Sequence, residues 1–269
     1  ADLSSDAGWP EALAGCRFVL HIASPMSGLD GDTLIATAVD GTRRVLGAAI
    51  AAGVERLVMT SSTAACTPAK PLRRAIDESD WTDPEQPGLA SYRRSKVLAE
   101  QAAWDAVAGS RTALVTLLPG AIFGPALAPD QAGSVSIIRG LLQGRPRLLP
   151  RLAFNITDVR DLAAAHVTAM TTPEAAGERF IVMGEPLWFG EVARVLHDRL
   201  GDRAAKVPTA PLPDWAARAL AFVSPQMREL LPLLGRTQKF SSAKAKRVLG
   251  FAPRPPSDTV ADCGASLRG

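Results

Sequence analysis

A tyrosine and a lysine four residues apart are the first candidates for chemistry in this chain. Tyr92 is the only tyrosine in 269 residues, and Lys96 follows it in a stretch of helix-forming residues without Gly or Pro. Positions i and i+4 share one face of a helix, so both side chains can point into one site. A cation beside a phenol favours the phenolate and lowers the phenol pKa from about 10 toward neutrality. The spacing predicts proton transfer by Tyr92. On this pair alone, the alternative interpretation of a surface tyrosine beside a solvated lysine stays open.

The surrounding chain alternates short apolar runs with helical stretches. Runs at residues 17–22, 55–60 and 113–118 have the length of buried parallel strands, and helices are expected over residues 34–52 and around Tyr92. A strand, a helix and a strand in this order form a parallel crossover unit. Ligands bind such sheets beyond the carboxyl ends of the strands, where residues 23–24, 61–62 and 119–120 would meet. The pattern therefore predicts a site at this edge of the sheet.

The predicted fold is α/β, with a Rossmann-like parallel sheet, flanking helices and a smaller, mostly helical C-terminal substrate lobe. Further helices are expected over residues 4–15, 133–143 and 188–200, and residues 154–159 lead into a helix that ends near residue 170. A last strand is expected over residues 179–183. The predicted dinucleotide-binding domain spans residues 1–125, with residues 154–184 returning to it. Residues 126–153 and 185–269 form the predicted substrate lobe.

Composition excludes several classes of partner. The 30 basic and 27 acidic residues nearly balance, and the basic stretch at residues 139–151 lacks interleaved aromatic residues, so nucleic acid binding is not expected. Cys16, Cys66 and Cys263 have neither metal-ligand nor disulfide-framework spacing, which suits a reducing compartment. No apolar run has the length of a membrane span, and the first residues do not resemble a signal peptide. We expect a cytoplasmic protein that acts on a small molecule without a metal or a membrane.

Several short motifs occur along the chain in a characteristic order. They are Ala-Asp-Leu at residues 1–3, His-Ile-Ala-Ser-Pro at 21–25, Thr-Ser-Ser at 60–62, Tyr92 with Lys96, Leu-Pro-Gly-Ala-Ile-Phe-Gly-Pro at 118–125, Asp-Val-Arg-Asp-Leu-Ala at 158–163 and Leu-Gly-Phe at 249–251. With these motifs the chain resembles the extended short-chain dehydrogenase/reductase family, in particular its aldehyde reductase and dihydroflavonol-reductase-like branch. The resemblance covers nearly the whole chain.

The resemblance implies an oxidoreductase that reduces an aldehyde or ketone with NADP(H), or alternatively with NAD(H). Tyr92 would give its proton to the carbonyl oxygen, Lys96 would hold the nicotinamide ribose, and Ser62 would hydrogen-bond the substrate carbonyl. It also implies that a homodimer can form through the helices at about 34–52 and 90–108. The residues implied to contact the cofactor are Asp2, Leu3, Ala23, Ser24, Thr60, Ser61, Tyr92, Lys96, Pro119, Gly120, Ala121 and Ile122.

Other interpretations of these residues stay open. Within the family, a sugar-nucleotide epimerase or a hydroxysteroid dehydrogenase/isomerase is disfavoured because residues 240–256 look like the aldehyde reductase branch. Outside it, the scaffold could serve as a non-catalytic dinucleotide sensor or interaction protein. Ser62 could simply end a strand with its hydroxyl on the backbone, and Pro119 with Gly120 could be a turn. His21 and His166 lie in apolar stretches and are interpreted as core histidines.

One motif of the family is missing from the sequence. The family begins with a strand and a GxxGxxG turn that approaches the cofactor pyrophosphate, and no such turn occurs here. The chain is expected to be a fragment of a longer reductase, which its start at Ala1 favours, or else a naturally shortened member. Either way, the strand at residues 17–22 should carry an unpaired apolar edge, so the chain alone is expected to be poorly stable or to self-associate.

Overall fold

A computed structural model describes residues 1–26, 30–128 and 133–267, which form two compact units. Unit 1 comprises Ala1–Pro119, Ala163–Val182 and Lys239–Phe251, and unit 2 comprises Gly120–Leu162, Met183–Gln238 and Ala252–Gly269. These bounds differ from the predicted domains: residues 120–125, 154–162 and 183–184 belong to unit 2, and residues 239–251 belong to unit 1. Residues 129–132 and 268–269 of the predicted lobe lie outside the described residues.

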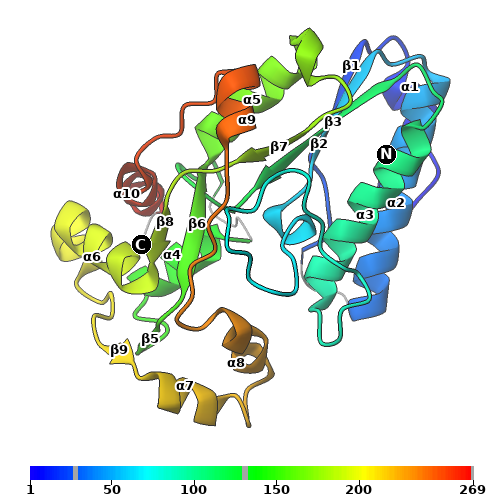
Figure 1. Cartoon of the computed structure of the whole chain (residues 1–269). Coiled ribbons are helices and arrows are strands. Elements are labelled where there is room, and N and C mark those ends of the chain that lie inside the picture. Colours follow the sequence, from blue (N-terminus) through cyan, green and yellow to red (C-terminus); the bar gives the residue numbers. More distant parts are fainter. Residues whose placement is uncertain (27–29, 129–132, 268–269) are drawn as a thin grey trace. The chain divides into compact units, whose positions relative to one another are not determined.

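Unit 1 is built on a parallel sheet in the order β1-β2-β3-β7 (Figure 1). Its strands are β1 (Phe18–His21), β2 (Arg56–Thr60), β3 (Ala113–Pro119) and β7 (Arg179–Val182). Its helices are α1 (Trp9–Leu13), α2 (Gly31–Ala51), η1 (Thr63–Ala65), α3 (Ser91–Val107), η2 (Pro173–Ala175) and α9 (Ala243–Leu249), and α5 (Val159–Thr171) enters it from unit 2. The predicted α/β fold with a parallel sheet and flanking helices is confirmed.

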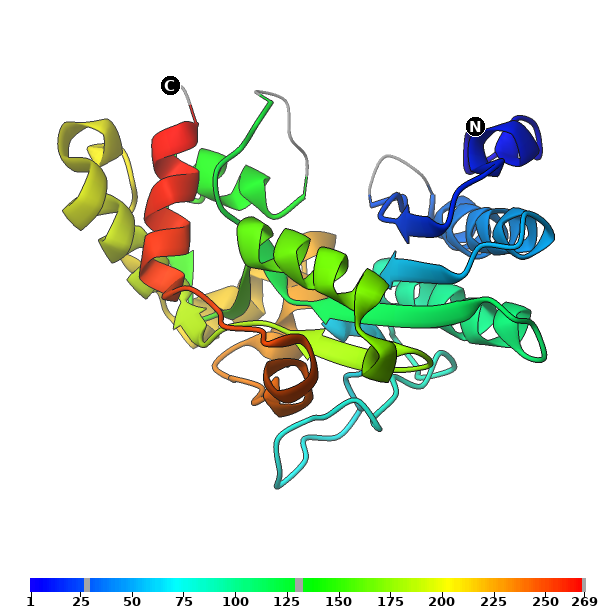
Figure 2. The same cartoon turned by 90° about the horizontal axis from the view of Figure 1, so that it is seen from above.

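The two faces of strand β2 contact different helices because side chains alternate along a strand. Leu57 and Met59 pack into an apolar cluster with residues of α2 and α3. Arg56 and Thr60 point the other way and hydrogen-bond the backbone and side chains of α5. Helices α2 and α3 run side by side (Figure 1 and Figure 2). Residue 61, the next odd position, therefore faces α3.

Strand β1 lies at the edge of this sheet. Among the described strands it pairs with β2 alone, and Leu20 and Ile22 are 38% and 58% exposed. An edge strand with exposed apolar side chains can pair with another chain. The predicted apolar edge is thus present, and the self-association expected from it stays a prediction.

The first predicted helix is wrong in its length. Residues 4–15 were expected to be helical, but α1 covers only Trp9–Leu13. Gly8 precedes it with φ 81°, a left-handed backbone conformation that interrupts a right-handed helix. Residues 1–3, the first motif of the resemblance, belong to no strand.

Unit 2 combines two small sheets with helices. Strands β4 (Ala121–Phe123) and β6 (Ala153–Asp158) are parallel, β8 (Pro186–Trp188) is antiparallel to β6, and β5 (Leu149–Pro150) pairs with β9 (Pro211–Leu212). Helices α6 and α10 pack side by side in this unit (Figure 2). The helices are α4 (Val135–Leu142), α6 (Phe189–Leu200), η3 (Gly201–Ala204), α7 (Asp214–Leu220), α8 (Pro225–Leu230), η4 (Leu231–Leu233) and α10 (Pro256–Ser266).

The core of unit 2 contains one buried carboxylate. Asp158 ends β6, and its side chain accepts hydrogen bonds from Arg160 at 2.7–2.9 Å and from Thr259 of α10 at 2.9 Å. The arginine and hydroxyl donors satisfy a charge that burial alone would disfavour. These bonds tie β6 to α10. Within the described ranges, no helix is long and apolar enough to cross a membrane.

Replacing Leu57 by Ala tests the packing of the sheet against α2 and α3. Leu57 is 0% exposed, so the substitution should lower the free energy of unfolding by about 2–5 kcal/mol through lost burial and a residual cavity. Leu127 is 95% exposed, and Leu127→Ala should change the same quantity by less than about 0.5 kcal/mol. Urea denaturation measures both. Equal effects of the two variants would contradict the assigned core.

Candidate active site

The three predicted catalytic residues lie together in unit 1. Ser62 is the second residue past the end of β2, and Tyr92 and Lys96 occupy the first two turns of α3. The Tyr92 phenol hydrogen-bonds the Ser62 side chain, and the Lys96 ammonium nitrogen lies 5.8 Å from the centroid of the Tyr92 ring. Lys96 and Ser62 are 6% and 9% exposed, and Tyr92 is half-buried. A phenol, a hydroxyl and an ammonium thus share one site.

The Ser62 hydroxyl contacts the backbone as well as Tyr92. Its oxygen accepts a hydrogen bond of 3.1 Å from the backbone N–H of Ala64 and so caps η1. A hydroxyl has two acceptor positions and one proton to donate. The backbone contact that the sequence left open for Ser62 therefore exists, and it orients the hydroxyl without using its proton.

The electrostatics of Tyr92 differ from the prediction. Burial raises the pKa of Tyr92, and the hydrogen bond from Ser62 lowers it only in part. The expected lowering of this pKa toward neutrality by Lys96 is wrong in this structure. Burial disfavours the phenolate, and the Lys96 ammonium lies 5.8 Å from the ring centroid and does not offset this effect. Tyr92 is consequently a protonated phenol at neutral pH.

Two neighbouring side chains at this site, Lys96 and His21, both have lowered pKa values. Burial lowers the pKa of Lys96 to about 8, and the negative charge of Glu100 acts in the other direction. Burial and the Lys96 charge lower the pKa of His21 to about 4. At pH 7 Lys96 is therefore mainly charged and His21 neutral. The His21 ring contacts the Thr42 hydroxyl at 3.3 Å, which agrees with its interpretation as a core histidine.

Sequence reasoning missed a buried ion pair behind the site. The Glu100 carboxylate is 0% exposed and accepts hydrogen bonds from Ser61 at 2.5 Å, Thr116 at 2.7 Å and Arg179 Nε at 2.8 Å. A signal was available, because Tyr92, Lys96 and Glu100 follow one another at intervals of four and share one helix face. Arg179 gave no such signal, since it comes from β7, far away in the sequence.

The residues expected to line the cofactor site in unit 1 fall into two groups. Ala23, Ser24, Ser61 and Pro119 lie at or just beyond the carboxyl ends of β1, β2 and β3, as the parallel sheet requires. Thr60 is buried and pairs with His166 at 2.7 Å, so both side chains serve the core. The other four residues of this group therefore fit a ligand site better than Thr60 does.

The other expected cofactor residues have local contacts. Asp2 accepts a hydrogen bond of 2.8 Å from the backbone N–H of Ser4, and Leu3 packs against Gly41 of α2. In unit 2 the Gly120 N–H donates to the Thr157 hydroxyl at 3.0 Å. There Ala121 and Ile122 begin β4, in register with Ile156 and Thr157 of β6. Their roles toward a cofactor stay predictions.

The donor set in unit 1 fits the nicotinamide ribose end of a dinucleotide. A buried ammonium at Lys96 and two hydroxyls at Tyr92 and Ser62 lie past the end of β2, where ribose hydroxyls and a carbonyl oxygen need donors. For the pyrophosphate end, the sequence offers no glycine-rich turn. In the part of the chain that is described, no group of three or more His, Cys, Asp or Glu side chains is placed to hold a metal ion.

Comparison with known proteins assigns the fold to a family. The model of the NAD dependent epimerase/dehydratase family matches residues 1–184. The chain belongs to this family. It is 34% identical over 200 residues to cinnamoyl-CoA reductase 1 of Petunia hybrida, a match that covers 73% of this chain and 60% of the petunia protein. It is 31% identical over 228 residues to an anthocyanidin reductase of Vitis vinifera, covering 78% of this chain and 67% of that protein.

A solved structure shows the same architecture over nearly the whole chain. Gre2 of Candida albicans, determined in complex with NADPH, superposes with a TM-score of 0.80 at 25% identity, over 99% of this chain and 82% of that one. The extended reductase branch predicted from the motifs is thereby confirmed. The chain spans 60% of the length of the petunia reductase.

The raised pKa of Tyr92 can be measured directly because the chain has one tyrosine. Phenolate absorbance near 295 nm should titrate with a midpoint above 10, and Ser62→Ala should raise the midpoint further by removing a hydrogen bond that favours the phenolate. Circular dichroism at each pH controls for unfolding. A midpoint at or below 10 in the folded protein would show that Lys96 outweighs burial.

Proposed function

We propose that this protein reduces an aldehyde or ketone with a nicotinamide cofactor, using Tyr92 as the proton donor. The observation that carries this proposal is the contact of Tyr92 with Ser62 at the end of a parallel strand, with the buried Lys96 one helical turn away. The family and the reductases similar to this chain support it. The reverse reaction, oxidation of the alcohol, uses the same groups.

The chain's own residues act on the carbonyl oxygen. A bound nicotinamide cofactor supplies the hydride. The phenol of Tyr92 and the hydroxyl of Ser62 donate hydrogen bonds to the oxygen as it gains negative charge, which lowers the barrier most where the charge develops. Tyr92 then transfers its proton to that oxygen. The ammonium of Lys96 stabilises the phenolate left behind and would hold the ribose hydroxyls.

We favour NADP(H) over NAD(H) as the cofactor. The support is the similarity to Gre2 of Candida albicans, whose structure contains NADPH, and to plant reductases. Ala23, Ser24, Pro119, Gly120, Ala121 and Ile122 are proposed to line the cofactor, and Asp2 and Leu3 the adenine. A cytoplasmic location is proposed from the free thiols of Cys66 and Cys263, which are buried without a disulfide.

Tyr92→Phe separates chemistry from binding. Removing the phenolic proton should lower kcat at least about 100-fold, the range of general acid catalysis, while NADPH affinity changes little because the ring remains. Carbonyl-dependent NADPH oxidation measures the first quantity, and energy transfer from tryptophan to NADPH the second. Thr33→Ala, on an exposed position of α2, is the control and should keep wild-type rates.

Each outcome of this experiment has a distinct meaning. Normal turnover by Tyr92→Phe would refute Tyr92 as the acid. Saturable NADPH binding without turnover on any aldehyde or ketone would instead favour the dinucleotide-sensing alternative.

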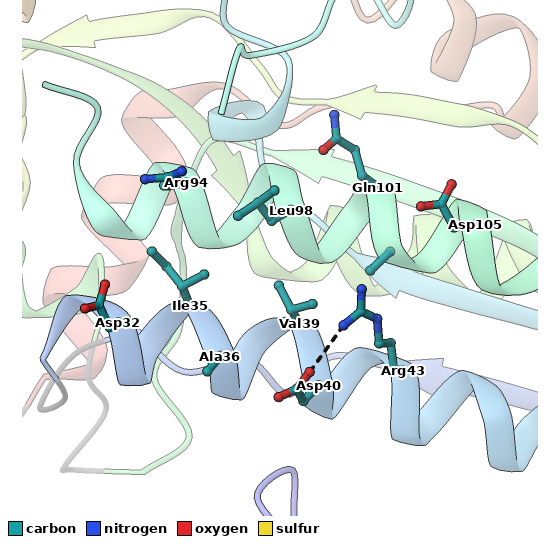
Figure 3. A pocket seen from close by; sticks show the side chains of 11 residues that line it. Asp32, Ile35, Ala36, Val39, Asp40, Arg43, Arg94, Leu98, Gln101 and Asp105 are labelled. Carbon is teal, nitrogen blue, oxygen red and sulfur yellow. Dashed lines mark hydrogen bonds and ion pairs between the residues drawn. The ribbon is translucent and has the colours of Figure 1, made fainter. Parts of the chain in front are cut away.

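We also propose that two copies of the chain pair through α2 and α3. The two helices border a groove of about 570 Å³ in unit 1, with Ile35 and Val39 on one side and Leu98 on the other (Figure 3). Asp40 and Arg43 form an ion pair of 3.4 Å within this groove. A half-buried apolar strip with charges around it is typical of a dimer interface core and rim.

Leu98→Glu tests the proposed pairing. A buried unpaired carboxylate in the groove should shift the dimer toward monomer at least tenfold in dissociation constant, as measured by analytical ultracentrifugation. Leu20→Lys places a charge on the edge strand β1 and is the comparison. A response to Leu20→Lys alone would assign self-association to the strand edge and contradict pairing through the helices.

A further inference from the structure

The strongest unassigned feature of unit 1 is the buried network around Glu100. Its carboxylate contacts side chains from β3, from β7, from the residue that follows β2 and from its own helix. Besides Ser61, Thr116 and Arg179, the indole N–H of Trp104 lies 3.4 Å from Glu100 Oε1. An ionised carboxylate removed from water costs several kcal/mol unless donors replace the lost hydration, and here they do. The network fixes how α3 is rotated against the ends of β2 and β3.

Arg179 is held in place from several sides. Its guanidinium donates to the backbone carbonyls of Glu78 at 2.7 Å and Asp80 at 2.9 Å, and its centre lies 3.6 Å from the Trp81 ring. Its side chain is 8% exposed. An arginine with this many partners stays beside Glu100, so the position of the negative charge is also fixed.

Ser61 connects this network to the catalytic end of β2. Its hydroxyl donates to Glu100 Oε2 at 2.5 Å, and its N–H donates to the carbonyl of Leu117 in β3 at 2.8 Å. Ser62 is the next residue, so the two hydrogen bonds of Ser61 restrain the backbone that carries the Ser62 hydroxyl. Holding Ser61 in place therefore limits where that hydroxyl can lie beside Tyr92.

We propose that Glu100 is a positioning residue for the reaction: its buried carboxylate holds Ser61, and with it Ser62, in place and keeps a negative charge one helical turn behind Lys96. This inference rests on the proposed function for its catalytic meaning. Glu100 itself touches neither substrate nor cofactor in this scheme. It acts through Ser61 and Lys96.

The charge of Glu100 contributes to the pH at which Lys96 loses its proton. Burial lowers the pKa of Lys96 to about 8, and Glu100 opposes this lowering. Removing the charge should lower the Lys96 pKa further, because less then favours the ammonium. If the reaction needs charged Lys96, the decline of activity on the alkaline side should then begin at a lower pH. The charged and titratable groups around Lys96 and Glu100 are His21 on β1, Tyr92 on α3, Arg179 on β7, and Cys66, Glu78 and Asp80 in the loop after η1.

Glu100→Gln is the principal test, with Thr116→Val as its matched control. Glu100→Gln should move the alkaline limb of the pH profile of kcat/KM to lower pH by roughly one unit. Thr116→Val removes a hydrogen bond from the same carboxylate but leaves its charge, so the limb should stay in place even if the protein is less stable. Equal shifts in both variants would overturn the proposal, since packing and not charge would then be responsible.

A second measurement keeps the proposal testable without turnover. NMR titration of ¹³Cε-labelled lysine, with the Lys96 resonance assigned by Lys96→Arg, should report a lower Lys96 pKa in Glu100→Gln than in the parent protein. Glu100→Asp retains the charge and should restore most of the parent value, so it is the control for this titration. An unchanged Lys96 titration in Glu100→Gln overturns the inference. No carbonyl reduction by the parent protein, with the NMR shift present, would instead refute the proposed function alone.

Discussion

Unit 1 depends on the satisfaction of one charge that has no access to water. Glu100 is fully buried, and its hydrogen bonds to Ser61, Thr116 and Arg179 require β2, β3, β7 and α3 to meet in a single arrangement. Losing Arg179, the charged partner, would leave Glu100 with an uncompensated buried charge, which costs about 3–5 kcal/mol. The same helix face that carries Glu100 carries Tyr92 and Lys96, so the ion pair that stabilises the unit also directs the candidate catalytic groups.

Burial and charge have opposing effects at the site, and their balance suits a proton donor. Removal from water favours the neutral forms of both Tyr92 and Lys96, raising the pKa of the phenol and lowering that of the amine. A phenol that keeps its proton at pH 7 is ready to donate it. The amine must remain charged to stabilise the phenolate that follows, and the Glu100 charge favours this state. The geometry thus supports reduction of a carbonyl.

The sequence predicted the parallel sheet, its order of elements and the grouping of Ser62, Tyr92 and Lys96, because hydrophobic runs and helical spacing depend on local composition. It failed where distant segments decide the outcome. Arg179 reaches Glu100 from β7, and the raised pKa of Tyr92 follows from burial that no spacing reveals. The first helix was predicted too long because the left-handed backbone of Gly8 was not foreseen. Pairwise motifs locate a site, but its electrostatics require the packed structure.

The most direct test of the account follows the hydride itself. The protein is incubated with an aldehyde or ketone and with NADPH carrying deuterium at the transferable position of nicotinamide C4, and the alcohol is analysed by mass spectrometry. The account predicts one deuterium on the former carbonyl carbon, since the hydride comes from the cofactor. An alcohol without carbon-bound deuterium, or no alcohol with any carbonyl compound while NADPH binds, would contradict it.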